Sequence, residues 1–233
     1  MHFKIESAPD TRGHDETRRQ LLEAAGDVFA TTGFRQATVR EICRRAGANV
    51  AAVNYHFGDK EALYAEVLRH AHRKAFEKYP LLPESGASAS PADKLRAFVR
   101  SFLLRIFDHG PTAWFGKMMA WEMIEPTGAL DSLLEERMRP MANQLGGIVA
   151  EILGGSPDDE RTRLCCLSVV SQCVFYHHCR QVVARLFPAQ QLNAGAIEPL
   201  ANHITSFSLA AMRHLPEVGT AKRRPRRSSP GRH

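Results

Sequence analysis

The sequence predicts an all-α protein of about nine helices, and three observations favour this fold class. Apolar residues recur at spacings of three and four along most of the 233-residue chain, as they do on one face of a helix. No segment has the alternation of apolar and polar residues that a half-buried strand requires. Glycine, proline and helix-capping residues divide the chain where these periodic segments end.

The N-terminal part of the chain predicts three helices. A flexible stretch, 1–14, precedes a first helix over 15–33, where leucine, alanine, valine and phenylalanine recur at helical spacing. A second helix spans 38–46 and a third spans 49–57, and Gly47 marks a tight turn between them. Two short helices joined by a glycine-containing turn are the pattern of a helix-turn-helix.

A fourth helix and a boundary follow. Asp59 is placed to cap a helix that continues to about Tyr79, so that 61–79 forms a connecting helix. The next segment, 80–91, reads PLLPESGASASP and predicts a linker, because proline, serine and glycine dominate it.

The remainder, 92–215, predicts five further helices. The first begins with Ser90 as the capping residue and Pro91 at the first helical position. Pro140 is expected to kink the helix that it interrupts. The predicted helices cover 92–108, 112–124, 129–153, 158–186 and 194–214.

Composition and charge exclude several classes of protein. Hydrophobic residues make up 44% and charged residues 24%, as in a globular protein. No apolar run approaches the roughly 18 residues of a membrane span, and the polar N-terminus has no secretory signal, so we expect a cytoplasmic protein without a membrane partner. The net charge of +6 resides in 222–233, which holds six basic residues and no acid. The tail, 216–233, is expected to be disordered. It is either a solubilising end or a segment that attracts nucleic acid weakly.

The helix pair is expected to have an apolar inner face and a polar outer face. The inner residues are Ile42, Ala46, Val50 and Val53, and the outer residues are Arg40, Arg44, Asn49, Asn54, Tyr55 and His56. Arginine and asparagine on an outward helix can read base edges in the major groove, whereas tyrosine, histidine and lysine can hold phosphates. Similar helix pairs occur in proteins that do not bind DNA, so a purely structural motif remains an alternative.

The amino-acid sequence of this region resembles the N-terminal domain of the TetR family of transcriptional repressors. The resemblance begins at LLEAAGDVFATTGFRQATVREICRRAG and continues through NVAAVNYHFGDKEALYAEVL. The matching positions are Gly33-Phe34, Thr38-Val39 with Ile42, Ala46-Gly47, and Tyr55-His56-Phe57 with Lys60 and Leu63. The resemblance implies a helix-turn-helix DNA-binding domain over 15–60 that recognises a double-stranded DNA operator.

The same resemblance implies a set of DNA-binding residues. They are Thr38, Arg40, Asn49, Val50, Ala51, Asn54, Tyr55, His56 and Lys60. The first two open the first helix of the motif, the next four lie on the recognition helix, and the last three would contact backbone phosphates. Since Ala51 and Ala52 are short, base readout is expected to depend on Arg40, Asn49 and Asn54.

The region after the linker resembles the C-terminal domain of the CerR-type subgroup of this family. The resemblance lies in WEMIEPTGALDSLLEERMRPMANQL and in SVVSQCVFYHHCRQVV. It implies an all-helical ligand-binding and dimerisation domain over 92–215, but it does not identify the effector.

The segment 112–124, TAWFGKMMAWEMI, is dense in tryptophan, phenylalanine and methionine. Ordinary core packing is one interpretation. The other is the wall of a pocket for a small, largely apolar or aromatic effector, because methionine adapts to varied ligands and tryptophan offers a flat apolar face. We expect no cofactor. The candidate ligand-binding residues are Trp114, Phe115, Met118, Trp121, Glu122, Phe175 and His178, with Glu122 placed to orient the ligand.

The segment 165–180, CCLSVVSQCVFYHHCR, holds four of the five cysteines. Cys173 and His177 are four residues apart and share a helix face, which Cys166 joins. Core or interface packing is the simpler interpretation, because no CxxC spacing is present, and no metal ligands are assigned. A soft metal site or a thiol switch remains an alternative.

The last two long predicted helices, 158–186 and 194–214, are expected to form a homodimer interface. Their apolar stripes are Leu164, Leu167, Val170, Val174 and His178 on one helix, and Leu200, Ile204, Phe207 and Ala211 on the other. Two such helices from each subunit can pair as a four-helix bundle, and a twofold dimer matches a palindromic operator. Packing within one chain is the alternative.

The sequence therefore predicts a homodimeric repressor that a small apolar effector releases from a palindromic operator. An activator of the same fold that responds to a small molecule or to redox state is one alternative. A helical enzyme or an adaptor that does not bind DNA is the alternative from another class. The chain has no nucleophile elbow, phosphate-binding loop or zinc-protease motif to favour an enzyme.

Overall fold

The computed structural model describes residues 11–81, 89–108, 113–190 and 193–215. These residues are almost entirely helical and include no strand, which confirms the all-α prediction. None of their helices combines the length and the apolar character that crossing a membrane requires. Most of the predicted linker, 80–91, and all of the basic tail, 216–233, lie outside the described residues.

The first half of the chain holds α1 (Thr11–Gln36), α2 (Val39–Ala46), α3 (Val50–Phe57) and α4 (Lys60–Lys78). The second half holds α5 (Pro91–Phe107), α6 (Ala113–Glu122), α7 (Gly128–Leu133), the π-helical turn η3 (Leu134–Met138), α8 (Arg139–Leu153), α9 (Glu160–His178), α10 (Arg180–Leu186), the short 3₁₀ turn η4 (Ala194–Ala196) and α11 (Ile197–His214).

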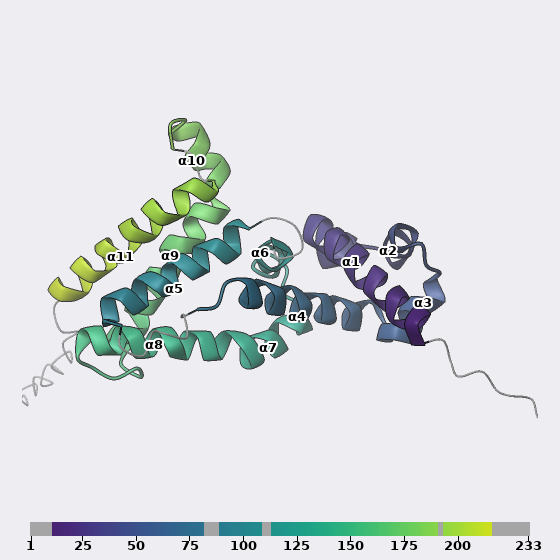
Figure 1. Cartoon of the computed structure of the whole chain (residues 1–233), viewed down its shortest axis with the longest axis horizontal. Coiled ribbons are helices and arrows are strands. Elements are labelled where there is room, and N and C mark those ends of the chain that lie inside the picture. The colour runs from purple at the N-terminus through teal and green to yellow at the C-terminus, as the bar shows by residue number, and fades with distance from the viewer. Residues whose placement is uncertain (1–10, 82–88, 109–112, 191–192, 216–233) are drawn as a thin grey trace, which may run out of the picture.

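The helices form two groups in an elongated molecule. Helices α1, α2 and α3 lie at one end, and α5, α8, α9 and α11 lie at the other (Figure 1). Helix α4 extends from the first group toward the second, and α6 lies between them (Figure 1). Helix α10 projects away from the second group (Figure 1).

Each of these groups surrounds its own set of buried apolar side chains. We call the first set the N-terminal core, formed by Leu21, Leu22, Ala24, Ala25, Val28, Phe29, Ala30, Ala37, Ile42, Cys43, Val53, Leu63, Tyr64, Val67, Leu68, Ala71, Trp114, Met118 and Leu133. We call the second the C-terminal core, formed by Leu95, Phe98, Val99, Leu103, Leu145, Ile148, Val149, Cys165, Val169, Cys173, Ile197, Leu200, Ala201, Ile204 and Met212. Helix α6 thus contributes to the N-terminal core although it follows α5 in the sequence.

The sequence signals for helix starts are confirmed by the caps. The side chain of Thr38 accepts a hydrogen bond from the Glu41 amide, and that of Asp59 accepts one from the Ala62 amide. Ser90 likewise accepts from the Asp93 amide, ahead of a proline in the first turn of α5. These bonds satisfy amides that have no partner within the helix, which fixes where each helix begins.

Three predicted boundaries need correction. Helix α1 begins at Thr11, so 11–14 is helical and not a flexible arm, and it runs past Gly33 with a kink at that residue (φ 75°). The predicted helix over 158–186 is divided at Cys179, where the backbone leaves helical geometry (φ −93°, ψ 11°).

The predicted helix over 129–153 is also divided, although not by a simple kink at Pro140. The π-helical turn η3 precedes the proline, and the Arg139 amide donates to the Leu134 carbonyl five residues back. Pro140 falls in the first turn of α8, where its missing amide hydrogen costs no intrahelical bond. The widened turn therefore absorbs the disruption ahead of the proline.

Candidate DNA-binding surface and ligand cavity

The turn between α2 and α3 has the geometry of a helix-turn-helix. Gly47 adopts the left-handed conformation (φ 64°), which a residue with a side chain rarely takes, and the Ala48 amide donates to the Cys43 carbonyl at 3.0 Å. The chain then enters α3 through Asn49, whose Oδ1 accepts from the Ala52 amide at 2.9 Å. The Asn49 oxygen that was expected to read a base is therefore occupied as a helix cap.

The residues predicted to contact DNA lie together around α3, on α2 and at the starts of α3 and α4. Seven of them are exposed, namely Thr38, Arg40, Asn49, Val50, Ala51, Asn54 and Tyr55, and two are half-buried, namely His56 and Lys60. Of the four residues expected to face inward, Ile42 and Val53 are buried and Ala46 is half-buried. Val50 is 46% exposed, so the inward assignment of Val50 is wrong. It is the first residue of α3, where the chain has not yet turned its face to the core.

The cations on this surface differ in how free they are. Arg40 has no hydrogen-bond or ion-pair partner among the described residues. Arg44 and Arg45 both pair with Glu41, at 2.9 Å and 2.6 Å, and these two guanidinium groups hold the pKa of Glu41 at about 2. Arg40 therefore offers DNA an uncommitted charge, whereas Arg44 and Arg45 would have to share theirs with the carboxylate.

The end of α3 meets the start of α1 through a group of rings. The imidazole of His14 lies 4.8 Å from the ring of Tyr55 and 4.5 Å from that of His56, measured between ring centroids. Sequence reasoning missed His14, because it placed this residue in a flexible arm. Lys60 lies 4.4 Å above the ring of Phe34, and partial burial lowers its pKa. The ammonium group of Lys60 is thus held against an aromatic face at the edge of the proposed DNA surface.

Three residues of α6 that were predicted to line a ligand pocket, Trp114, Met118 and Trp121, face the N-terminal helices. Trp114 is buried against Gly26, and its Nε1 donates to Asp27 Oδ1 of α1 at 3.0 Å. Trp121 covers Gly33 at the kink of α1. Met118 is fully buried in the N-terminal core. These three residues, which were predicted to line a pocket, thus pack against the N-terminal helices, and none of them lines the four cavities found among the described residues.

Glu122 also belongs to this contact and does not face a cavity. It is 1% exposed, and its Oε1 accepts from the Tyr64 hydroxyl of α4 at 2.7 Å and from the Thr127 hydroxyl at 2.9 Å. Its Oε2 accepts from the Thr127 amide at 2.8 Å. Both carboxylate oxygens are occupied by groups of the protein, so the orienting role predicted for Glu122 has no support in this geometry.

The opposite face of α6 lines an apolar cavity of about 220 Å³ between α4, α5, α6, α8 and α9. We call it the α6 cavity. Its walls are Phe76, Phe102, Arg105, Ile106, Phe115, Gly116, Met119, Met123, Met138, Met141, Val170, Val174, His177 and His178. Of the predicted ligand-binding residues, Phe115 and His178 lie here. Phe115 and Met119 also pack against the N-terminal core, so the same side chains touch both the cavity and the N-terminal group of helices.

Sequence reasoning missed most of this cavity, including its one buried cation. Arg105 is 2% exposed and stands between Leu104 and Ile106 in the apolar run LLRIF. A charged residue within such a run is the signal that could have drawn attention to it. His177 lies on the same wall, and burial, helped by Arg180 and His178, lowers its pKa to about 4. The histidine is therefore neutral near pH 7.

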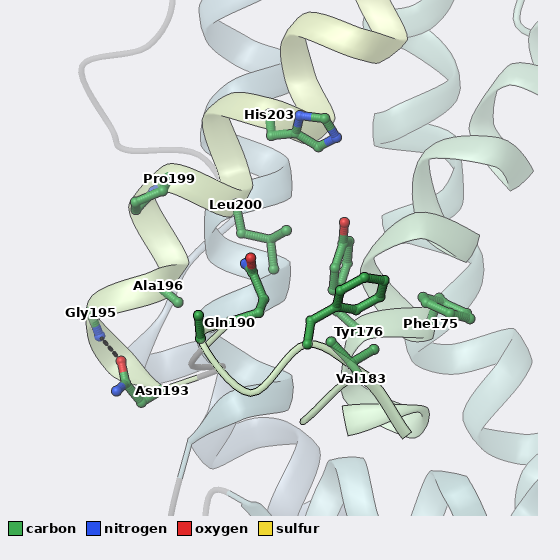
Figure 2. A pocket seen from close by; sticks show the side chains of 12 residues that line it. Phe175, Tyr176, Val183, Gln190, Asn193, Gly195, Ala196, Pro199, Leu200 and His203 are labelled. Carbon is green, nitrogen blue, oxygen red and sulfur yellow. Dashed lines mark hydrogen bonds between the residues drawn. The ribbon is translucent and has the colours of Figure 1, made fainter. Parts of the chain in front are cut away.

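A second depression lies at the surface between α9, α10 and α11 (Figure 2). Phe175, Tyr176, Val183 and Leu200 border it, and Asn193 Oδ1 accepts from the Gly195 amide at its edge (Figure 2). Its volume of about 860 Å³ is largely open to solvent. The predicted ligand-binding residue Phe175 thus lies on this depression and not on the α6 cavity.

The thiols of α9 lie in apolar surroundings. Cys165 and Cys173 belong to the C-terminal core, and burial raises the pKa of Cys173 to about 12 and that of Cys166 to about 11. The described residues form no group of three or more metal-binding side chains. A raised pKa keeps these thiols protonated and weakly nucleophilic, which gives no support to a thiol switch.

The predicted dimer stripes are divided between the core and the surface. Leu200 and Ile204 are buried in the C-terminal core, and Val170 and Val174 line the α6 cavity, so these four are not exposed for an interface. Four large apolar residues remain exposed on α9 and α11, namely Leu164, Leu167, Phe175 and Phe207, with Leu167 at 61% and Phe207 at 59%. We call them the α9–α11 face.

Comparison with known protein families identifies both parts of the chain. Residues 21–67 match the family described as bacterial regulatory proteins, tetR family. Residues 91–212 match the C-terminal domain of the HTH-type transcriptional dual regulator CecR, which covers more than half of the chain. This second match confirms the expected subgroup, whose proper name is CecR and not CerR.

Individual relatives agree with these matches. The chain is 28% identical to the dual regulator CecR of Shigella flexneri over 63% of this chain and 69% of that protein. It is 24% identical to the transcriptional repressor NicS of Pseudomonas putida over 85% of this chain and 93% of that protein. The fold is similar to that of FadR from Bacillus subtilis, solved in complex with stearoyl-CoA, with a TM-score of 0.60 at 17% identity over 82% of this chain and 97% of that one. All are transcriptional regulators, which sets the enzyme alternative aside.

Proposed function

The chain belongs to the TetR family of bacterial transcriptional regulators, and we propose that it is a homodimeric repressor released from a palindromic operator by a small apolar effector in the α6 cavity. The observation that carries this proposal is the position of helix α6. One face of α6 lines the cavity, and the other holds α1 and α4. A ligand that moves α6 must therefore also disturb the helices that carry the helix-turn-helix.

The proposed DNA surface consists of α3 and its flanks. The free guanidinium of Arg40, the exposed amide of Asn54 and the hydroxyl of Tyr55 supply the hydrogen-bonding groups that base edges and phosphates require. Asn49 keeps its amide nitrogen for this purpose, although its oxygen caps α3. Base readout is thus proposed to depend more on Arg40 and Asn54 than on Asn49.

The proposed dimer pairs the α9–α11 face with its twofold copy. Leu167, Phe175 and Phe207 expose more than half of their surface and Leu164 nearly half, and all four lie on the two longest helices of the C-terminal group. An exposed group of large apolar side chains is typical of an interaction surface. Burying them in a four-helix bundle removes this exposure and relates two helix-turn-helix units by a twofold axis. Repression is proposed because relatives such as NicS are named repressors.

The repressor proposal is tested by selecting operators from random duplex DNA with the purified protein. Recovery of a palindrome supports it, and the half-site spacing gives the dimer geometry. Unselective binding that high salt abolishes would contradict it, because only charge would then hold the DNA. The sign of regulation is read from transcription with and without the protein on the recovered site.

The DNA surface is tested with Arg40→Ala against the matched control Arg44→Ala on the same helix. Loss of the free Arg40 guanidinium is expected to weaken operator binding about tenfold or more, whereas loss of the paired Arg44 has a smaller effect. Equal effects of the two substitutions in a fluorescence-anisotropy titration would contradict the distinction drawn between free and paired cations.

The dimer is tested with the double substitution Leu167→Glu and Phe207→Glu, which places charges on the α9–α11 face. Light scattering coupled to size exclusion is expected to report a monomer. Ile124→Glu, at an exposed apolar site beyond α6, is the control and should remain dimeric. A dimer that survives the double substitution would place the interface elsewhere.

A further inference from the structure

The α6 cavity contains a buried cation without a countercharge in the part of the chain that the structure describes. Arg105 is 2% exposed, and its Nη1 donates to the Tyr79 carbonyl and to the Ser101 hydroxyl, both at 2.9 Å. Its Nη2 is equally buried and has no hydrogen-bond partner among the described residues. Nearly all buried polar groups are hydrogen-bonded, and a buried charge is normally paired. The arrangement is therefore incomplete as it stands.

No acidic group of the described residues compensates this charge. The side chain stacks on Phe76, with its guanidinium carbon 4.1 Å from the ring centroid, and it also approaches Phe102. Cys173 is close enough to affect its titration, but burial raises the pKa of that thiol to about 12 and keeps it neutral. Burial lowers the pKa of Arg105 to about 10, which still leaves it protonated near pH 7. The cavity thus has a fixed positive charge in apolar walls.

A second donor lies on the same wall. Arg180 Nη1 is 3.2 Å from His177 Nε2, and a guanidinium can only donate, so Nε2 of the neutral histidine is the acceptor. The ring hydrogen of His177 must then be on Nδ1. The described lining of the cavity consequently combines the charged donor Arg105 with the neutral ring of His177, and no acidic residue belongs to it.

We propose that Arg105 is the anchor for the carboxylate of the effector, which makes the effector an apolar monocarboxylic acid. The proposal rests on the α6 cavity being the effector site of the proposed function, and it specifies the chemistry of that site. Arg105 Nη2 donates to one carboxylate oxygen, and the rest of the ligand contacts the phenylalanine and methionine side chains. A carboxylate completes both the hydrogen bonding and the charge of Arg105 at once, which a neutral apolar molecule does not.

The dimensions of the cavity limit the size of the acid. At the roughly 30 Å³ that one water occupies in the liquid, 220 Å³ holds roughly seven non-hydrogen atoms before any side chain moves. Four methionines, Met119, Met123, Met138 and Met141, line it and can rearrange around ligands of different shape. Medium-chain fatty acids and arylalkanoic acids fit this description.

The test compares each acid with its neutral isosteric amide on the full-length protein. Octanoate is paired with octanamide and phenylacetate with phenylacetamide, and binding is measured by calorimetry and by the shift in Tm. For at least one pair the acid is expected to bind about tenfold or more tightly than the amide, because a hydrogen bond to a charged group is the stronger one. Equal affinity of acid and amide, or no binding of either acid, would overturn the proposal.

Substitutions test whether the preference for an acid over its amide arises at Arg105. Arg105→Met is expected to reduce the difference between acid and amide to about twofold or less. Arg100→Met makes the same change on the exposed side of α5, where the arginine pairs with Glu198, and should keep the full preference. If Arg105→Met does not fold, Arg105→Lys retains the charge without Nη2 and is expected to lose several-fold of the preference. If the Arg105 variants keep the full preference for acid over amide, Arg105 is not the carboxylate anchor.

Operator binding without any ligand separates this proposal from the proposed function. A protein that selects a palindrome but does not distinguish acids from amides remains a regulator and disproves the carboxylate anchor. A protein that prefers acids through Arg105 but selects no operator retains the anchor and disproves the repressor. Release of the operator by the acid and not by the amide supports both.

Discussion

The contact of Glu122 with Tyr64 and Thr127 gives a prediction that separates a structural role from a ligand-binding role. The Glu122 carboxylate accepts three hydrogen bonds, two from Thr127 and one from the Tyr64 hydroxyl, and it joins α6 to α4 and to the start of α7. Replacing it with alanine removes all three acceptors. We expect Glu122→Ala to destabilise the protein and to weaken the link between α6 and the N-terminal helices.

The magnitude follows from the burial of the three donors. Tyr64 is 1% exposed, so its hydroxyl loses its partner without access to water, at a cost of about 1–3 kcal/mol. Thr127 is only half-buried, and water can replace part of its two bonds, which adds about 1 kcal/mol. Relief of the desolvated carboxylate offsets some of this loss. The net expectation is a decrease of about 2–3 kcal/mol in the free energy of unfolding.

Glu122→Gln is a finer test of the same geometry. The glutamine Oε1 can keep the bonds from Tyr64 and Thr127 hydroxyls, but its amide nitrogen would face the Thr127 amide, a donor against a donor. Its expected cost is about 1 kcal/mol, less than that of alanine.

The assay is urea unfolding, together with titration of effector and operator. Glu125→Gln, which changes a half-buried carboxylate in a loose 3.5 Å pair with Arg35, is the control and should cost less than about 0.5 kcal/mol. If Glu122→Ala unfolds like the wild type but no longer binds the effector, the structural role of Glu122 is refuted and the residue is a ligand contact.

Three further predictions concern stability. Burial lowers the pKa of His72 and His177 from 6.5 to about 4, so the unfolded chain binds more protons than the folded one as the pH falls below 6.5. Each histidine is expected to lower the free energy of unfolding by up to about 3 kcal/mol by pH 4. A free energy of unfolding in urea that does not change between pH 6.5 and pH 4 would contradict the burial of the two rings. Gly26→Ala would bring a Cβ to 2.3 Å from the ring of Trp114, which should cost about 1–3 kcal/mol and lower the Tm, and an unchanged Tm would show that the ring moves freely. Gly47→Ala meets no neighbouring atom and should cost only the strain of the left-handed backbone, about 1–2 kcal/mol; a larger loss by the same assay would indicate contacts that the turn does not have.

Local signals predicted the helix starts because a cap acts over three residues. Thr38, Asp59 and Ser90 each bond to an amide three positions on, and that relation is visible in the sequence. Pro140 signalled a disruption of the helix predicted over 129–153, but not its form, and the break at Cys179 had no signal. The π-helical turn before Pro140 and the break at Cys179 depend on how neighbouring helices pack, which periodicity along one helix does not report.

The candidate ligand site was harder to predict for a related reason. Helical spacing places Trp114, Met118 and Trp121 on one stripe, but it does not tell which neighbour a stripe meets, and this one meets α1 and the N-terminal core. Arg105 was not singled out from the sequence, because its burial arises from α4, α6 and α9 converging on it. Only the tertiary structure brings a charged side chain from α5 and the methionines of α6 and α8 into one cavity.

The two-faced character of α6 has a consequence for engineering. In the proposed mechanism, the residues that contact the ligand and the residues that transmit its presence belong to different surfaces. Trp114 and Glu122 of α6 hold α1 and α4, whereas Val170 and Val174 of α9 line the cavity without touching the N-terminal core. Libraries confined to the α9 wall are therefore expected to change which compound is detected and to leave the link to the helix-turn-helix intact.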